Sequence, residues 1–244
     1  MMISLILSIL MYQSPIVVFT KEEIEKYEEL SKSVNEGRLI DYTLQYPKYR
    51  FLQYLSLKGS YVFHGSNYRN IDRFEPREQT LYNNELTKAV FATTEPIWSI
   101  FYAVFNRSAL IGSFRNGCLI GRNKKYHFYS INESTIKNNP WTDGMLYILP
   151  KEKFHMSGQG KVQFDEWTCN EYVAPVGKIS VSLSDFYFLN KVAVHKDKES
   201  LYSTIVPGYS IKHELYWRIR RGQVTAHNTV STLRSVRTLI RKKK

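Results

Sequence analysis

Three short motifs follow one another in a fixed order, and each borders a short run of β-forming residues. Residues 61–66 read YVFHGS, residues 90–93 read VFAT, and residues 170–173 read NEYV. Clusters rich in glycine, proline, asparagine and serine separate these runs, and such clusters are typical of turns. A chain with this pattern has to bring several short strands together from distant positions, which constrains the fold more than any single residue does.

Helical patterns lie before the first of these motifs. The run that begins at Thr20 fits a capping box, and apolar residues recur at helical spacing up to Gly37, so a helix is expected over 20–36. An aromatic-rich second helix is expected over 39–57, with an interruption at Pro47.

Strands dominate the rest of the chain up to about residue 190. Thr94 is expected to cap a third helix that starts near Pro96 and runs to about Phe105, whereas residues 67–88 are expected to be mainly loop. This mixture predicts an α+β fold rather than a βαβ repeat. The expected strands are 61–64, 89–92, 118–120, 126–130, 145–149, 171–174 and 178–183.

Composition indicates one substantial core and a basic tail. The chain has 244 residues, of which 43% are hydrophobic. We expect a helical extension over 1–58, a central domain over 59–190 and a basic extension over 191–244.

The net charge of +12 comes mainly from the end of the chain, because residues 212–244 hold ten of the 34 Lys and Arg residues and one of the 22 acidic residues. Such a tail suits nucleic-acid phosphates; an anionic membrane surface, or no specific partner, are the alternatives.

Cysteine usage and the N-terminus indicate the compartment. Cys118 and Cys169 show no metal-ligand spacing, so we expect two reduced thiols and no metal site. No run is long enough to span a bilayer. Residues 1–19 are mostly apolar but lack the charged start and the clear cleavage site of a signal peptide. A cytoplasmic protein with a buried N-terminal segment is therefore expected, and secretion is the alternative if residues 1–19 act as a signal.

The first motif places a histidine and a glycine at a strand end. His64 can bond a ribose hydroxyl while it is neutral, and Gly65, with no Cβ, lets a flat ligand approach its backbone. A structural histidine at a strand terminus is the alternative.

The second motif provides aromatic rings. Phe91 ends a strand and Tyr102 follows eleven residues later on the expected helix, so the two rings can face each other across a planar ligand. Ser99 lies one helical turn before Tyr102 and can point to the same side. The same aromatic residues would also suit a plain hydrophobic core.

The third motif supplies a carboxylate, Glu171, where a polar run meets a strand. Such a group can bond a ribose 2′-hydroxyl and stabilise the oxocarbenium-like charge that develops when a glycosidic bond breaks. Glu166 is a nearby rival for the role, and a solvated glutamate is the structural alternative.

Together the motifs resemble the ADP-ribosyltransferase superfamily, specifically its histidine–tyrosine–glutamate branch, which includes diphtheria-type toxins and poly(ADP-ribose) polymerases. The resemblance covers roughly residues 60–190. His64-Gly65-Ser66 matches the family's His-Gly-Ser/Thr motif, and Phe91-Ala92-Thr93 matches its YFA-type strand. Asn170-Glu171-Tyr172-Val173 matches the segment that carries the family's catalytic glutamate.

The resemblance implies a split β-sandwich core, NAD as co-substrate and no metal. It implies that Glu171, His64 and Tyr102 act in catalysis. For NAD binding it implies that His64, in the His64-Gly65-Ser66 motif, binds the ribose and that Gly65 and Ser99 bind the carboxamide. It further implies that Tyr102 and Phe91 stack on nicotinamide, and Arg77 could contact a phosphate.

Two departures from the family pattern refine this prediction. Phe91 stands where the family commonly has tyrosine, which keeps the stacking and loses a hydroxyl contact. Cys169 stands two residues before Glu171, where arginine-directed transferases carry Glu or Gln, so arginine is disfavoured as the acceptor. Glu171 itself argues against the related RNA 2′-phosphotransferases, whose chemistry does not use this glutamate.

The sequence thus predicts a NAD-dependent mono-ADP-ribosyltransferase that releases nicotinamide and modifies a protein or nucleic-acid acceptor. The basic tail favours nucleic acid, or a protein bound to it, as the target. One alternative is a catalytically inactive module of the same fold that binds NAD, ADP-ribose or nucleic acid. Another is a structural nucleic-acid-binding protein that acts through residues 212–244.

Overall fold

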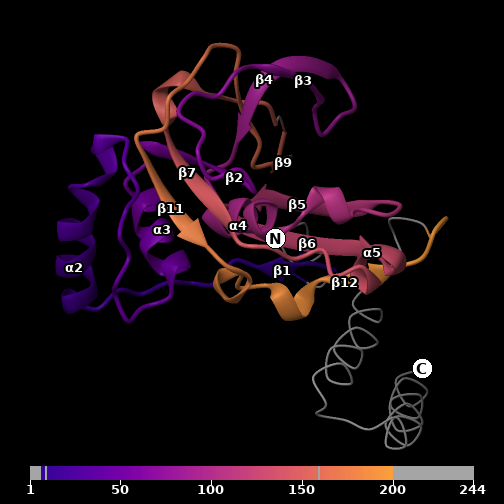
Figure 1. Ribbon diagram of the computed structural model, residues 1–244, viewed down its shortest axis with the longest axis horizontal. Helices are drawn as coiled ribbons and strands as arrows, with labels where there is room; N and C mark the ends of the chain where they lie inside the picture. Colours follow the sequence, from indigo (N-terminus) through magenta and orange to yellow (C-terminus); the bar gives the residue numbers. More distant parts are fainter. Residues whose placement is uncertain (1–6, 9, 159, 200–244) are drawn as a thin grey trace, which may run out of the picture.

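The computed structural model describes residues 7–8, 10–158 and 160–199, and in this part of the chain three β-sheets carry most of the ordered structure (Figure 1). The central sheet has the order β11-β7-β2, which are Gly177–Val181, Gly144–Pro150 and Tyr61–Ser66. The β4 sheet has the order β3-β4-β10-β8. Its strands are β3 Arg77–Thr80, β4 Leu86–Ala92, β10 Trp167–Cys169 and β8 His155–Met156. The β6 sheet has the order β1-β6-β5-β9, and β12 also pairs with β6. Its strands are β1 Tyr12–Gln13, β6 Lys124–Asn132, β5 Phe114–Gly121, β9 Val162–Phe164 and β12 Ala193–His195.

Helices pack around these sheets, and the expected α+β class is confirmed. The strand pairs of the described residues are antiparallel, apart from β12 with β6. From residue 11 to residue 199, apart from residue 159, the α-helices are α2 Lys21–Ser31, α3 Lys48–Leu57, α4 Pro96–Val104 and α5 Glu133–Lys137. Short 3-10 turns lie at Val34–Glu36, Arg107–Ala109, Lys151–Lys153, Leu183–Asp185 and Leu189–Lys191. The helices within these ranges are too short to cross a membrane.

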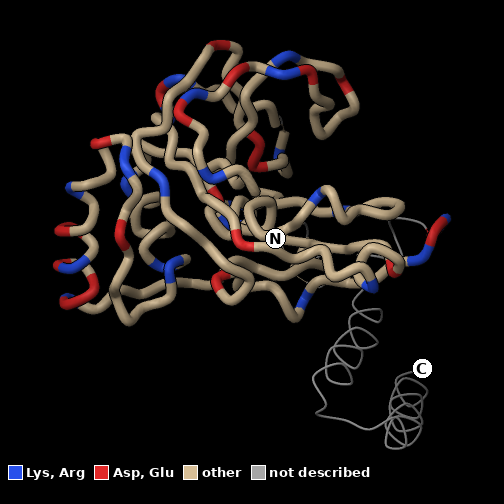
Figure 2. The backbone as a smooth tube through the Cα atoms, viewed as in Figure 1, with Lys and Arg blue, Asp and Glu red and all other residues tan. Residues whose placement is uncertain are grey.

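The capping box predicted at Thr20 is confirmed and starts α2. The Thr20 hydroxyl oxygen accepts from the Glu23 N–H at 3.2 Å, and the Glu23 carboxylate accepts from the Thr20 N–H at 3.1 Å. The α-helix ends at Ser31, short of the predicted residue 36, and a 3-10 turn over Val34–Glu36 follows it. Gly37 ends this turn in a left-handed conformation with φ 68°. Acidic and basic residues intermix along the outer face of α2 (Figure 2), where the pair Lys26–Glu22 is one turn apart.

The second predicted helix is only half right. Residues 48–57 form α3, which begins directly after Pro47, but residues 39–47 are not helical. Leu39 instead bridges to Lys178 beside β11, and the Ile40 N–H donates to the Lys178 carbonyl at 2.8 Å. A long-range backbone pairing therefore replaces the helix that the aromatic pattern suggested.

Two further local predictions needed correction. The cap of α4 is Glu95 rather than Thr94: the Glu95 carboxylate accepts from the Ile97 N–H at 3.3 Å, whereas the Thr94 hydroxyl donates to Asp165 at 2.8 Å. The stretch expected to be mainly loop over 67–88 contains β3 and the start of β4.

The strand predicted at 171–174 is also wrong. The ladder of β10 ends at Cys169, and only Val173 pairs again, through a single bridge to Phe74. The chain passes here from the β4 sheet to the central sheet, so it leaves one ladder before it joins the next. The following strand, predicted at 178–183, is β11, which ends at Val181, so the prediction is two residues too long.

The central sheet is buried on both faces. Phe63, Leu146 and Ile148 point into a core shared with α3 and α4. Val62 and Tyr147, on the opposite face, belong to a second core shared with the β4 sheet. This alternation along β2 and β7 fixes their register, because a slip of one residue would exchange the two faces.

A tight turn joins β5 to β6. Arg122 and Asn123 have φ 51° and 62°, and two such residues in a two-residue loop are characteristic of a type I′ turn. The resulting register sets Cys118 directly opposite His127.

An ion pair joins α2 to α3. Arg50 donates from Nε to Glu23 at 2.7 Å and from Nη2 at 2.8 Å, and the Glu23 side chain is 3% exposed. The Arg50 hydrogen bond lowers the pKa of Glu23 from 4.5 to about 2, despite its burial. A depressed carboxyl pKa stabilises the fold above the unfolded pKa, and this contribution is lost as the pH falls through the folded value.

We predict that Glu23→Gln, which keeps the capping box and removes the charge, lowers the free energy of unfolding at pH 7 by about 2 kcal/mol. The native protein should lose stability between about pH 4.5 and pH 2, and this part of the pH dependence should be reduced in the variant. Urea unfolding at several pH values measures both effects, and Glu29→Gln, in an exposed pair, is the matched control. Equal pH profiles for Glu23→Gln and the native chain would contradict the assignment.

Candidate active site

The first two motifs meet where β2 and β4 touch. Phe63 and Thr93 exchange both backbone hydrogen bonds, at 2.7 and 3.0 Å. His64 follows on β2, and its Nδ1 lies 2.7 Å from the carbonyl oxygen of Phe91. Because a carbonyl can only accept, Nδ1 carries the proton, and Nε2 of the neutral ring is an acceptor.

Gly65 presents its backbone to the same edge of β2. Along a strand, successive residues direct their N–H and C=O to opposite edges, so Gly65 and Phe63 direct theirs to the same edge, away from β7. Phe63 uses its groups in the bridge to Thr93, and those of Gly65 lie on the same side, beyond that bridge. A Cβ at Gly65 would lie 1.8 Å from the carbonyl oxygen of Ser99. Helix α4 therefore packs directly on the β2 backbone, and only glycine fits at this position.

Ser99 is fixed by the same contact. Its hydroxyl donates to the Phe63 carbonyl at 2.9 Å, and the side chain is buried. Ser66 has a local role as well, because its Oγ accepts from the Tyr68 N–H at 3.1 Å in the turn that follows β2.

Tyr102 lies three residues beyond Ser99 on α4. The Arg107 guanidinium carbon is 5.2 Å from the centre of the Tyr102 ring. Burial raises the pKa of the Tyr102 phenol, and the negative charge of Glu166 also raises this pKa. The Asn116 side chain, by hydrogen bonding, and the positive charge of Arg107 lower it. No ring contact links Phe91 to Tyr102 among the described residues, and strand alternation sets Phe91 on the opposite face of β4 from the buried Val90 and Ala92.

His64 lies in a basic environment. Burial lowers the pKa of its imidazole, the Phe91 carbonyl opposes this shift, and the positive charges of Arg107 and Arg77 reinforce it. The ring is consequently neutral at pH 7. Arg77 comes from β3, as an exposed residue, and Arg107 from the turn after α4. Sequence reasoning named Arg77 and missed Arg107, whose only sequence signal is its position five residues after Tyr102.

The third motif reaches this region indirectly. Val173 and Phe74 exchange backbone bonds at 2.8 and 3.1 Å, and the Phe74 ring lies 4.7 Å from the His64 ring, centre to centre. Glu171 itself is exposed, and its carboxylate bonds none of the other predicted site residues in the described ranges.

Glu166, the rival carboxylate, has a different setting. It is half-buried on the link between β9 and β10, and burial raises its pKa while the Tyr82 N–H, 3.5 Å away, lowers it. Its charge acts on Tyr102. Of the two glutamates, Glu171 is therefore exposed, whereas Glu166 is half-buried and acts electrostatically on Tyr102.

Comparison of the chain with family models, with curated proteins and with solved structures found no match.

We predict that Gly65→Ala lowers the free energy of unfolding by about 1–3 kcal/mol, because the new methyl group would overlap the Ser99 carbonyl. Ser66→Ala, one residue further on the same strand, is the matched control and should cost less. Urea unfolding of both variants provides the comparison. A Gly65→Ala protein as stable as the native chain would show that α4 does not pack against β2 in this way.

Proposed function

We propose that the chain is a NAD-dependent ADP-ribosyltransferase of the histidine–tyrosine–glutamate type. The observation that carries the proposal is the His64–Phe91 hydrogen bond at the edge where the Gly65 backbone is directed past the β2–β4 bridge. Ser99 and Tyr102 follow Phe91 by eight and eleven residues on α4, which packs on the face of β2 at Gly65.

The chemistry of these groups suits the nicotinamide end of NAD. An adjacent N–H and C=O on Gly65 complement the carbonyl and amino groups of a carboxamide, and Ser99 lies beside them. Tyr102 supplies a ring for stacking, as does Phe91 from β4. The Nε2 acceptor of His64 suits a ribose hydroxyl, and the charges of Arg77 and Arg107 suit the pyrophosphate.

The reaction breaks the bond between the ribose C1′ and the nicotinamide nitrogen, and the bonding electrons leave with nicotinamide. A nucleophile on the acceptor then bonds to C1′ and gives up its proton. Positive charge develops on the ribose in between, and a carboxylate stabilises it. Resemblance assigns this role to Glu171, and the half-buried Glu166, whose charge acts on Tyr102, is the competing assignment.

A second candidate function is NAD or ADP-ribose binding without catalysis. The observation that favours it is the exposure of Glu171, whose carboxylate has no bond to the other proposed site residues within the described ranges. The acceptor, whether protein or nucleic acid, also remains a proposal. The basic segment 212–244, which favours nucleic acid, lies outside the described residues.

We predict that Glu171→Gln lowers nicotinamide release from NAD by about 10²–10³-fold and leaves NAD affinity nearly unchanged, because shape is kept and charge is lost. Glu166→Gln is measured in parallel, and Glu152→Gln, an exposed glutamate of the turn at Lys151–Lys153, is the control. The readout is nicotinamide release together with transfer of labelled ADP-ribose to lysate protein or nucleic acid. Loss with Glu166→Gln alone would reassign the catalytic carboxylate, and a native protein that binds NAD without turnover would favour the binding module.

We predict that Tyr102→Ala weakens NAD binding by about tenfold, because a stacking ring and its apolar area are lost. Tyr102→Phe keeps the ring and should bind NAD nearly as the native chain does. Calorimetric titration measures both affinities, and urea unfolding checks that each variant is folded. Unchanged affinity in a folded Tyr102→Ala protein would exclude the stacking role.

A further inference from the structure

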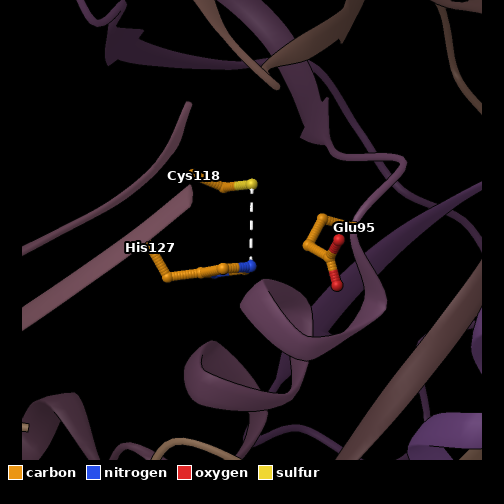
Figure 3. Close-up of side chains that lie close together, drawn as sticks. All are labelled: Glu95, Cys118 and His127. Carbon is orange, nitrogen blue, oxygen red and sulfur yellow. Dashed lines mark hydrogen bonds between the residues drawn. The ribbon is translucent and has the colours of Figure 1, made fainter. Parts of the chain in front are cut away.

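A second group of chemically active side chains lies inside the protein. Glu95 comes from the cap of α4, Cys118 from β5 and His127 from β6, and all three are buried. One ligand atom from each lies within 4.8 Å of the others, and Cys118 Sγ is 4.0 Å from His127 Nε2 (Figure 3). Of the residues described, only these three form such a group.

The spacing of Cys118 and His127 approaches that of two ligands in a tetrahedral metal site. Bonds of about 2.3 Å to sulfur and about 2.1 Å to nitrogen at a tetrahedral angle set the two ligand atoms about 3.6 Å apart. The observed 4.0 Å therefore requires a shift of a few tenths of an ångström. The register of the β5–β6 hairpin, which sets Cys118 directly opposite His127, already provides this approach.

His127 is oriented as metal-binding histidines are. Its Nδ1 lies 2.9 Å from the Tyr129 hydroxyl, which leaves Nε2 toward the other two ligands. Such a partner on the far nitrogen holds the ring and its tautomer. The Ser14 hydroxyl oxygen lies 2.7 Å from His127 Nε2 and 3.1 Å from the Glu95 carboxylate, so it is the nearest oxygen for a fourth position.

The charges around the group also favour a cation. Lys125 lies 2.8 Å from Asp165 and 3.7 Å from Glu95, so one ammonium faces two buried carboxylates. A divalent cation with the Cys118 thiolate adds one net positive charge and balances them.

We propose that Glu95, Cys118 and His127 bind one Zn²⁺ ion in a structural site, with the Ser14 hydroxyl oxygen at the fourth position. Thiolate, imidazole and carboxylate are the ligands that zinc uses in proteins. On binding, the Cys118 thiol releases its proton to solvent, and the Ser14 hydroxyl gives up its bond to His127. The site joins the start of α4 to β5 and β6, and it does not depend on the proposed transferase activity.

Cobalt titration tests this site, because a cysteine thiolate bound to Co²⁺ gives a near-ultraviolet charge-transfer absorption. The full-length chain is reduced, freed of metal with a chelator and titrated with Co²⁺. We expect one equivalent per chain to produce that absorption together with the intense visible bands of tetrahedral cobalt. Added Zn²⁺ should abolish both and raise the Tm, whereas Mg²⁺ should do neither.

Cys169 provides a matched control, because it is also buried but bonds to the Glu171 carbonyl oxygen, away from the group. Cys118→Ser should lose the charge-transfer absorption, and Cys169→Ser should keep it. If Cys118→Ser does not fold, X-ray absorption at the zinc edge of the native chain decides, and one sulfur ligand is expected. The proposal is overturned if the native chain gives no cobalt absorption or if Cys118→Ser gives the same absorption as the native chain. A zinc coordination shell without sulfur also overturns it.

Discussion

The candidate active site depends on direct backbone contact between α4 and the central sheet. A Cβ at Gly65 or at Gly144 would lie 1.8 or 1.9 Å from a carbonyl oxygen of α4. The helix can approach this closely only because both positions lack a side chain. That approach carries Ser99 to the Phe63 carbonyl and sets Tyr102 one helical turn further along. Any change that moves α4 away from the sheet therefore displaces the serine and the tyrosine together relative to β2.

Local signals in the sequence predicted local structure well. The capping box at Thr20 and the left-handed Gly37 depend on neighbours within a few residues, and both are present. The proline at the start of α4 behaved as expected, although Glu95 took the cap because the Thr94 hydroxyl bonds to Asp165, 71 residues away. The hydrogen bond between His64 and Phe91 was not predicted, because the sequence indicated only that each residue lies near the end of a short strand.

Features that arise from distant pairings were not predictable in the same way. Residues 39–47 leave the helical pattern because Leu39 and Ile40 pair with Lys178, and no local rule contains that partner. The grouping of Cys118 and His127 follows from a two-residue turn at Arg122 and Asn123, neither of which is glycine, so the usual hairpin signal is missing. Glu95 joins them only through the packing of α4, and sequence spacing consequently indicated no metal ligands.

The turn from β4 into α4 connects the two sites. Thr94 bonds to Asp165, the adjacent Glu95 faces Cys118 and His127, and Ser99 follows one helical turn later. Asp165 belongs to the buried charges, while the charge of its neighbour Glu166 acts on Tyr102. A cation held by Glu95 would therefore fix the start of the helix that carries Ser99 and Tyr102. Loss of that cation should reduce the stability of the fold, and through α4 it should also weaken the NAD binding that we propose.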